Sequence, residues 1–476
     1  MDVIEDAARL DSLYRRHLPD DGRSGFSLIR TGPEALSTLL GLAAASQRTL
    51  DVQYYLWEDD WSGRQLLAAL LDAADRGVRV RLLLDDIGAT RSDPELARLG
   101  TYPNVQVRLY NPFPRRFGLV FGVLFHARRV SRRMHNKAFV ADRCAAVVGG
   151  RNVGDRYFEL HPQRNFRDLD LFTAGPVVEQ VAGSFDAFWN SAFSRSIHAL
   201  DRGRWRLADV RSTARRGLRR RILPAEKSVP VSHSGFDPAD LDDQIQTLFA
   251  GLILADEATV LVDSPDKPET GDPRLLKELL ARLEGTPMRD LLIEATYFIP
   301  TRYGVRLLSR LVRQGTRVRI LTNSAGSGDV PLAYAAYRQY RIPLLRAGIQ
   351  LYELRDRPFR VAGRNGLMVN LHTKAAVIDQ REVFVGSLNL DPRSATLNTE
   401  IGLLVRSRTL ALQVAAFIED GMAPERAYQP VLRGDELVWR ARDRDGMAEL
   451  KREPGTTLWR TFLAWILYLL PLEAQL

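Results

Sequence analysis

One pattern occurs twice in this chain and divides it into two similar halves. Residues 77–86 read GVRVRLLLDD, and residues 315–324 read GTRVRILTNS. Each run follows an amphipathic stretch, at residues 64–76 or 304–314, and begins with a glycine that ends the helix before an alternating, β-branched strand. A repeated helix–strand unit predicts a duplicated fold with two similar domains side by side.

Further strand patterns lie at matching places in the two halves. Residues 50–56 (LDVQYYL) and 291–299 (LLIEATYFI) lie upstream, and residues 105–110 and 349–354 lie downstream. Strands that alternate with helices are typical of α/β layers. The sequence therefore predicts an α/β protein with two tandem domains, each a mixed β-sheet flanked by helices, related by pseudo-two-fold symmetry.

The length of the chain, 476 residues, also exceeds what one hydrophobic core usually holds. We expect a first domain at residues 1–200 and a second at residues 233–430. Residues 201–232, rich in arginine, read as a basic linker or surface helix between them. Residues 431–476 read as a C-terminal amphipathic extension.

Each half carries a histidine followed, at identical offsets, by a lysine, an aspartate, a glycine and an asparagine. These residues are His135, Lys137, Asp142, Gly149 and Asn152 in the first half, and His372, Lys374, Asp379, Gly386 and Asn389 in the second. Seven histidines and six lysines placed at random would give about 7 × 6/476, or roughly 0.09, His-x-Lys pairs. Two such pairs at equivalent points of a repeat argue against a merely structural role for these histidines.

The spacing suits catalysis at a phosphodiester. Residues 135–140 read as a strand, in which His135 and Lys137 project from the same face. Residues 145–148 read as a second strand, whose glycine end can return Asn152 to the same rim and let the backbone approach a phosphate. A two-fold arrangement of the halves would place two histidines, two lysines and two asparagines around one phosphoryl group.

Such a set can transfer a phosphoryl group without a metal. One neutral imidazole attacks phosphorus to form a phosphohistidine, and the other, protonated, gives its proton to the leaving alkoxide. Lys137, Lys374, Asn152 and Asn389 would stabilise the equatorial oxygens. Two ammonium groups supply the charge that a divalent metal supplies elsewhere, so we expect neither metal nor cofactor.

A histidine of this kind needs an acceptor for its second ring nitrogen. Asp168 (NFRDLDLF) and Glu400 (LNTEIGLL) lie in strand-like runs at comparable distances downstream of the two motifs, and Asp170 competes with Asp168. Asp142 and Asp379 complete the motif and are therefore included among its candidate catalytic residues, together with His135, Lys137, His372 and Lys374. Their positions nevertheless favour a role in holding a turn or positioning the lysine strand over a role in the chemistry.

The motif HxKxxxxD followed by GxxN closely resembles the signature of the phospholipase D superfamily. The stretches TLDVQYYLWEDDWSG, GVRVRLLLDD, RMHNKAFVAD, VGGRNVGDRYF and FLAWILYLLPLEAQL are similar to those of bacterial cardiolipin synthases of the C type, over nearly the full length. This resemblance implies two phospholipase D-like domains, with motifs at residues 135–152 and 372–389. It also implies transfer of a phosphatidyl group to phosphatidylglycerol, with phosphatidylethanolamine among the donors.

The resemblance further implies that the halves cooperate. Glu400 would orient His135 as the nucleophile, and Asp168 would orient His372 as the acid and base, although the near symmetry leaves the reverse order open. Ser387 matches the usual GSxN ending, whereas Gly150 occupies that position in the first motif and removes a hydroxyl contact there.

The net charge of +9 and the pI of about 9.7 favour an anionic partner, either nucleic acid or acidic lipid. Three segments favour an anionic membrane: an apolar block at residues 117–125 flanked by arginines, an aromatic segment at 458–472, and a basic stretch at 202–221. A buried hairpin, a helix packed on the core and a solvated face are the respective alternatives. We find no basic groove with interleaved aromatics of the kind that binds nucleic acid, so no nucleic-acid partner is expected.

Three matters stay open in the sequence: transfer to an alcohol or hydrolysis to phosphatidic acid, a nuclease or phosphodiesterase activity of the same superfamily, and the need for a protein partner. The N-terminus lacks the apolar core of a secretory signal, and no run approaches the ~20 apolar residues that span a bilayer. We therefore expect a peripheral protein on the cytoplasmic side of the cell membrane. The single cysteine, Cys144, excludes an intramolecular disulfide and reads as a small buried residue rather than a nucleophile.

Overall fold

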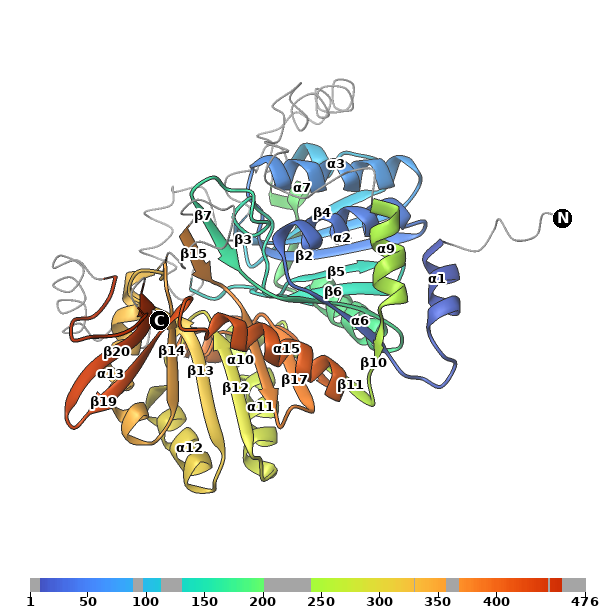
Figure 1. Cartoon of the computed structure of the whole chain (residues 1–476). Helices are drawn as coiled ribbons and strands as arrows, with labels where there is room; N and C mark the ends of the chain where they lie inside the picture. Colours follow the sequence, from blue (N-terminus) through green and yellow to red (C-terminus); the bar gives the residue numbers. More distant parts are fainter. Residues whose placement is uncertain are drawn as a thin grey trace.

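The structure, a computed structural model, describes residues 9–88, 97–112, 131–200, 241–328, 330–356, 368–443 and 446–455. It contains two large mixed β-sheets, one mostly from each half of the chain, with helices on both faces. Figure 1 shows the first half, in blue and green, stacked on the second, in yellow and red. The predicted α/β class with two mixed sheets is confirmed.

The first sheet has nine strands in the order β10-β1-β8-β6-β5-β2-β3-β4-β9. Their bounds are β1 (Gly25–Ile29), β2 (Thr49–Leu56), β3 (Arg79–Gly88), β4 (Val105–Tyr110), β5 (Ala138–Ala141), β6 (Ala145–Gly149), β8 (Asp170–Ala174), β9 (Ser194–Ser196) and β10 (Ile253–Leu254). β2, β3 and β4 are parallel to one another, as the repeated helix–strand pattern requires. Helices α2 (Gly32–Ala45) and α3 (Trp61–Asp75) cover one face, and α6 (Val177–Asn190) covers the other.

The second sheet has ten strands in the order β11-β18-β17-β16-β12-β13-β14-β19-β20-β21. Their bounds are β11 (Glu257–Val262), β12 (Asp290–Ala295), β13 (Arg317–Asn323), β14 (Gln350–Leu354), β16 (Lys374–Ile378), β17 (Glu382–Gly386), β18 (Ile401–Arg406), β19 (Ala427–Arg433), β20 (Glu436–Asp443) and β21 (Gly446–Leu450). Helices α11 (Arg274–Gly285), α12 (Thr301–Arg313) and α13 (Pro331–Arg346) cover one face, and α15 (Arg408–Gly421) covers the other. The order from β11 to β14 repeats the order from β1 to β4, which is the structural form of the duplication.

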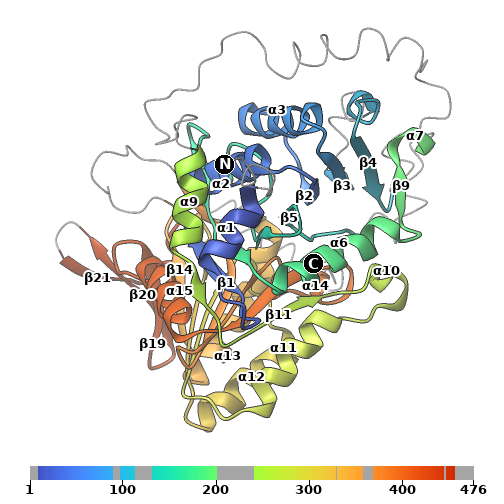
Figure 2. The same cartoon turned by 90° about the vertical axis from the view of Figure 1, so that its right-hand side faces the viewer.

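The two halves share one apolar core. A single cluster of buried side chains contains Phe26 and Leu171 of the first sheet and Leu292 and Val385 of the second. Helices α6 and α15 contribute to the same cluster, and Figure 2 shows α6 running between the halves. Because apolar side chains from both sheets exclude water together, the halves pack as one body and hold the motifs in a fixed relation.

A small two-stranded sheet also joins the halves at the level of the motifs. It pairs β7 (Arg164–Arg167) of the first half in parallel with β15 (Met368–Leu371) of the second, and the two strands lie side by side in Figure 1. β15 leads directly into His372, and β7 leads directly into Asp168. This pairing therefore brings a histidine of one half beside an acid of the other.

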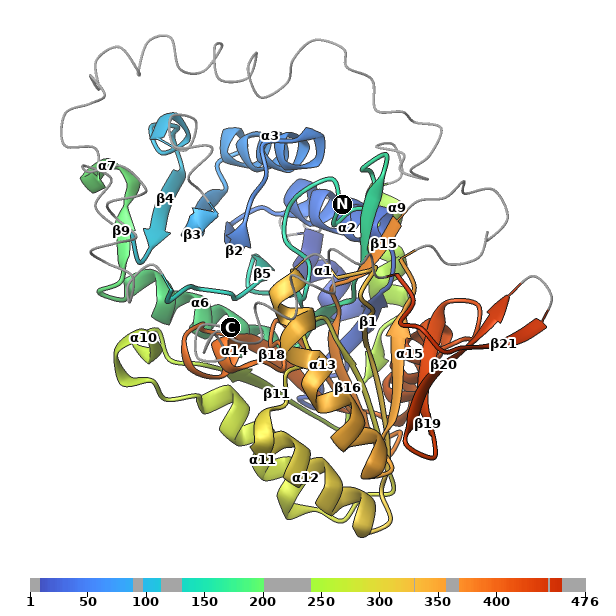
Figure 3. The same ribbon diagram turned by 90° about the vertical axis from the view of Figure 1, so that its left-hand side faces the viewer.

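Two segments differ from the expected domain boundaries. Helix α9 (Leu241–Ala250) packs on α2, and β10 pairs with β1. Residues 241–254 therefore pack with the first half, and the expected start of a second domain at residue 233 does not match this arrangement. Within the expected C-terminal extension, residues 431–433, 436–443 and 446–450 belong to strands β19, β20 and β21, which continue the second sheet beyond β14 at the edge seen in Figure 3. The physical reason is the same in both cases, because each segment covers an otherwise unpaired strand edge.

Several expectations fall on residues outside the described ranges. These are the linker at 201–232, the apolar block at 117–125 and the aromatic segment at 458–472. Among the helices that are described, none is long and apolar enough to cross a membrane.

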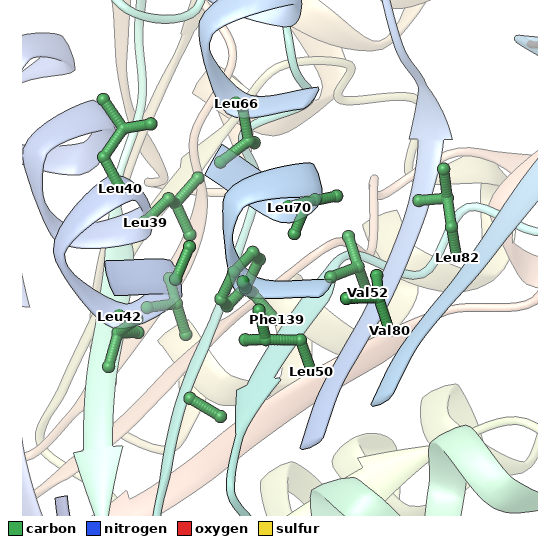
Figure 4. Close-up of a cluster of buried hydrophobic side chains, with 14 of the residues drawn as sticks. Leu39, Leu40, Leu42, Leu50, Val52, Leu66, Leu70, Val80, Leu82 and Phe139 are labelled. Carbon is green, nitrogen blue, oxygen red and sulfur yellow. The ribbon is translucent and has the colours of Figure 1, made fainter. Parts of the chain in front are cut away.

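The core of the first half explains why its helices form where they do. Thr31 and Glu34 form a capping box at the start of α2, with Pro33 in the first turn. Leu39 of α2 and Leu70 of α3 then face Val52 and Phe139 on the sheet, as Figure 4 shows. Apolar residues at helical spacing on α2 and α3 thus meet alternate residues of the strands.

We predict that Leu70→Ala destabilises the protein by about 2–5 kcal/mol, because it leaves a cavity in this well-packed cluster. Leu70 is 1% exposed. The measurement is denaturant unfolding, with Leu412→Ala as the control, since Leu412 is 43% exposed and should change stability little. Equal unfolding midpoints for the two variants would contradict the packing described.

Candidate active site

The two histidine motifs are attached to the opposite halves of the chain through their backbones. His135 N donates to the carbonyl oxygen of Thr399 at 2.9 Å, and His372 N donates to that of Arg167 at 2.8 Å. Neither histidine lies within a strand of the large sheets, since β5 begins at Ala138 and β16 at Lys374. The expectation that residues 135–140 form one strand is thus wrong at its first residues, because these pair across the boundary between the halves.

Each histidine also receives its carboxylate from the other half. Nδ1 of His135 lies 2.8 Å from Glu400 Oε2, and Nδ1 of His372 lies 2.6 Å from Asp168 Oδ2. These are the pairs that the family resemblance implied. Because Nδ1 donates to a carboxylate, Nε2 carries the lone pair and is the atom available for a substrate.

The first acid is held by a hydroxyl. Glu400 is fully buried, and Ser387 Oγ donates to the same Oε2 atom that binds His135. Burial raises the pKa of Glu400, but His135, Lys137 and Ser387 outweigh it and hold the pKa below its usual value. Glu400 therefore remains ionised and oriented.

The second acid is held by its own backbone. Asp168 is also fully buried, and its Oδ1 accepts from Leu169 N at 2.8 Å. Burial raises its pKa, but His372, Lys374 and Arg151 outweigh burial and lower the pKa to about 2. Its competitor in the sequence, Asp170, instead pairs with Arg151 at 2.8 Å.

Both imidazoles are neutral near neutral pH. Burial lowers the pKa of His135 to about 4, with Glu400 opposing the change and Lys137 and Lys374 adding to it. Burial likewise lowers the pKa of His372 to about 4, with Lys374 and Lys137 adding to it and Asp168 opposing it. The positive charges of Lys137 and Lys374 lower the pKa of both histidines. The charged groups of the two motifs therefore lie close enough to interact within one site.

The two lysines are held unequally. Lys137 Nζ donates to His135 O at 2.6 Å and lies 5.5 Å from the ring centre of Tyr55. Lys374 Nζ donates to Thr296 Oγ1 at 2.9 Å and also to the carbonyl oxygen of His372. Burial holds the pKa of Lys137 well below its usual value, so a bound phosphate anion would favour its protonated form.

The asparagines lie at the ends of the matching β6 and β17 loops. Asn152 Oδ1 accepts from Leu56 N at 3.2 Å, and Asn152 lines a small cavity together with Lys137 and Tyr54. Asn389 is buried, and its Oδ1 has no hydrogen-bond partner within the described part of the chain. An unpaired buried amide oxygen beside the motif can accept a hydrogen bond from a ligand.

Comparison with known proteins places this arrangement in a family. A family model described as cardiolipin synthase, phospholipase D-like domain, matches residues 39–189 and 285–420. The chain belongs to this family. It is 38% identical to cardiolipin synthase C of Escherichia coli (strain K12), over 95% of this chain and 96% of that protein.

Two more distant proteins are also similar to this chain. The cardiolipin synthase family member described here is 26% identical to cardiolipin synthase B of Escherichia coli (strain K12), over 80% of this chain and 76% of that protein. A crystal structure of phosphatidylserine synthase from Haemophilus influenzae Rd KW20 superposes with a TM-score of 0.58, at 15% identity, over 88% and 92% of the two chains. At that identity the match shows a shared fold.

The family member also contains site residues that sequence reasoning missed. The ring of Tyr55 lies 5.1 Å from that of His135, and the rings of Tyr157 and Phe166 each lie 5.1 Å from that of His372. Tyr55 lies in the stretch QYYLW, and Tyr157 lies in GDRYF. Both stretches contributed to the family resemblance, but the sequence indicated no role for either tyrosine. These aromatic side chains form walls beside the imidazoles.

A second missed feature is the residue that fixes the segment entering each motif. Asp85 Oδ2 accepts from Met134 N at 2.8 Å, and Asn323 Oδ1 accepts from Leu371 N at 2.9 Å. Asp85 and Asn323 occupy the same position of the repeated runs that end in DD and NS. The signal was a polar residue at the end of a buried strand in both copies.

The motif aspartates do not belong with the catalytic groups. Asp142 accepts from the backbone amides of Gln47, Arg48 and Thr49, and Asp379 accepts from those of Arg289 and Asp290. Each follows its strand at the end away from the histidine and has a positive φ of 52°. Their inclusion among the catalytic residues is therefore wrong, whereas the turn-holding role read from the sequence fits these contacts.

The structure also shows the surroundings of the single cysteine and of the possible metal ligands. Cys144 is half-buried, donates to Asp11 Oδ1 at 2.6 Å, and burial raises the pKa of its thiol to about 12. A thiol of this kind is not an activated nucleophile. Across the described ranges, no group of three or more histidine, cysteine or acidic side chains could hold a metal ion.

We predict that the free energy of unfolding falls as pH is lowered from about 6.5 to about 4. In this range His135 and His372 bind protons in the unfolded chain but remain neutral in the folded chain, because folding lowers the pKa of each to about 4. The stability is present above the unfolded pKa and is lost through this window, with a slope of at most about 1.4 kcal/mol per pH unit per histidine. Denaturant unfolding at several pH values measures it. His135→Gln and His372→Gln should each flatten the dependence, and an unchanged slope in both variants would refute it.

Proposed function

We propose that the protein transfers a phosphatidyl group to phosphatidylglycerol through a phosphohistidine, and so makes cardiolipin. Membership of the cardiolipin synthase family makes it an enzyme, a phosphatidyltransferase of the phospholipase D type. The observation that supports the detailed reaction is the pair of buried histidines, each bound through Nδ1 to an acid of the other half. Two oriented imidazoles are what a two-step exchange at phosphorus requires.

In the first step, Nε2 of neutral His135 attacks phosphorus of the donor phospholipid. The phosphorus–oxygen bond to the headgroup breaks as the phosphorus–nitrogen bond forms, and protonated His372 gives its Nε2 proton to the leaving alkoxide. The negative charge of the bound phosphate favours that protonation, although His372 is neutral without substrate. Glu400 balances the positive charge that develops on the ring of His135.

In the second step, neutral His372 takes the proton of a phosphatidylglycerol hydroxyl. The hydroxyl oxygen then attacks phosphorus, and the bond to His135 breaks. Lys137 and Lys374 lie beside the two imidazoles, where their ammonium groups stabilise the phosphoryl oxygens, and Asn152 and Asn389 supply amide donors. The near symmetry of the site also permits the reverse assignment of the two histidines.

Transfer rather than hydrolysis is favoured by the enclosure of the site. His135 and His372 are each only 7% exposed, and aromatic rings lie against both. Restricted access of water slows hydrolysis of the phosphohistidine, so that an alcohol can react with it instead. Phosphatidic acid formation by hydrolysis is the second candidate, because it shares the first step.

We also propose that the protein acts as a peripheral protein on an anionic membrane surface, at the cytoplasmic side. The net charge of +9 supports attraction to acidic headgroups. The apolar and basic segments at residues 117–125, 202–221 and 458–472 are the proposed contacts, by their composition alone.

We predict that the purified protein in mixed micelles forms cardiolipin from phosphatidylglycerol, and that added phosphatidylethanolamine increases the yield if it is a donor. His135→Ala and His372→Ala should abolish the product, because each removes one of the two imidazoles. His198→Ala, which changes an exposed histidine bound to Gly100 O, is the matched control. Products are resolved by mass spectrometry.

The same assay separates the alternatives. Phosphatidic acid without cardiolipin would indicate a hydrolase. The absence of any lipid product from the wild-type protein would refute the lipid assignment, and single-stranded DNA would be the next substrate.

We predict that Glu400→Gln and Asp168→Asn each lower kcat by roughly 10²- to 10⁴-fold, because the amide no longer fixes the tautomer or stabilises the imidazolium. Binding of the lipid should change much less, so the fall appears in kcat rather than KM. Asp435→Asn, at a side chain 95% exposed, is the control. Wild-type kcat in either site variant would contradict the pairing across the halves.

A further inference from the structure

The two GxxN sequences differ at their middle positions, and the structure gives a steric reason. The second half has Ser387, whose hydroxyl holds Glu400. At the equivalent position the first half has Gly150, where an added Cβ would lie 2.3 Å from Asp168 Oδ1. No side chain fits there, so Asp168 has no hydroxyl partner from this position.

The next residue differs as well. Arg151 replaces Leu388 and is 3% exposed. Its Nη2 donates to the carbonyl oxygen of Asp168 at 2.6 Å and to that of Arg30 at 3.1 Å. Its Nη1 donates to Asp170 Oδ2 at 2.8 Å. One guanidinium therefore holds the backbone of the acid that orients His372.

Asp170, the partner of Arg151, is also particular to the first half. The sheet register pairs Gly149 with Asp170 and Gly386 with Gly402, so Asp170 and Gly402 are equivalent. Arginine and aspartate thus occur together in one half, where leucine and glycine occur together in the other. This joint difference indicates that Arg151 and Asp170 form one unit.

The charge of Arg151 bears on Asp168 too. Asp168 and Asp170 are buried two residues apart, and each carboxylate disfavours ionisation of the other. Arg151 lies against both and opposes the rise in the pKa of Asp170 that burial causes. Without this cation, two buried carboxylates would compete for a proton beside His372.

We propose that Arg151 is a positioning residue, which holds Asp168 and through it His372, in place of the hydroxyl that Ser387 gives to Glu400. The proposal rests on the proposed role of His372 in the transfer reaction. It means that the duplicated site keeps its two histidine–acid pairs by different means, a buried ion pair in the first half and a hydroxyl in the second.

The test uses Arg151→Leu combined with Asp170→Asn, which removes both charges and leaves no buried ion unpaired. The control is Arg81→Leu combined with Asp51→Asn. That pair is another buried arginine–aspartate contact of the same sheet, with Arg81 Nε 2.6 Å from Asp51 Oδ1. Arg81 also lies 2.8 Å from Asp186, which keeps Arg143 as a second partner when Arg81 is replaced. Both double variants lose a buried arginine–aspartate pair of the same sheet, so a general loss of stability appears in both.

The first readout needs no lipid. In protein labelled with ¹⁵N-histidine, the Nδ1 protons of His135 and His372 give separate NMR signals, identified by their loss in His135→Ala and His372→Ala. We expect the Arg151/Asp170 variant to shift or lose the His372 signal and keep that of His135, whereas the Arg81/Asp51 variant keeps both. The second readout is lipid transfer, where we expect kcat to fall about 10-fold or more with KM within about two-fold.

A wild-type His372 signal and wild-type kcat in the folded Arg151/Asp170 variant would overturn the proposal, and would leave Arg151 as a structural partner of Asp170. If that variant does not fold, Arg151→Lys replaces it, because it keeps a cation beside Asp170 but lacks the forked donors that reach Asp168 O as well. We expect the same change of the His372 signal in smaller measure, and an unchanged signal and kcat would overturn the proposal. A His372 signal that responds as expected in a protein without lipid product would refute the proposed function and leave the positioning role standing.

Discussion

Each imidazole of the site hydrogen-bonds a buried carboxylate that lies more than 200 residues away in the chain, in the other half. Burial would otherwise make both acids weak and both histidines poorly oriented, because a low-dielectric interior disfavours isolated charge. The two reciprocal pairs overcome both effects, because each histidine stabilises the ionised acid and each acid orients the histidine that it binds. Neither half has a complete histidine–acid pair of its own, so a functional site requires the halves to pack together.

The packing that satisfies this requirement is extensive. The apolar cluster shared by both sheets fixes their relative position, and the β7–β15 pair brings Asp168 beside His372. Around them lie buried charges that would each be unfavourable alone, including Lys137, Lys374 and Arg151. They are tolerated because opposite charges and backbone dipoles lie in contact, and the same balance leaves the imidazoles neutral and the acids ionised.

Duplication supplied two copies of the machinery, and later divergence made them unlike. Lys374 is held by the hydroxyl of Thr296, whereas Lys137 lies near the face of Tyr55. Glu400 is held by Ser387, and Asp168 by contacts in which Arg151 participates. A phosphotransfer in which one histidine attacks and the other exchanges a proton has no need of identical halves, and such differences allow each pair to be adjusted separately.

The sequence by itself determined what depends on local order: the duplicated α/β pattern, the spacing of the two His-x-Lys motifs, and the candidate acids Asp168 and Glu400. Residue periodicity and spacing carry that information. The structure places these acids directly after β7 and directly before β18 rather than within a strand. Only the tertiary structure decided that the histidine segments pair across the halves instead of extending β5 and β16, and which distant segments Asp142 and Asp379 hold. It also decided that β10 completes the first sheet. It also brought Tyr55, Tyr157 and Asp85 to the site. These features depend on contacts between residues far apart in the chain, which are set by the packing of two sheets on one shared core and leave no periodic trace in the sequence.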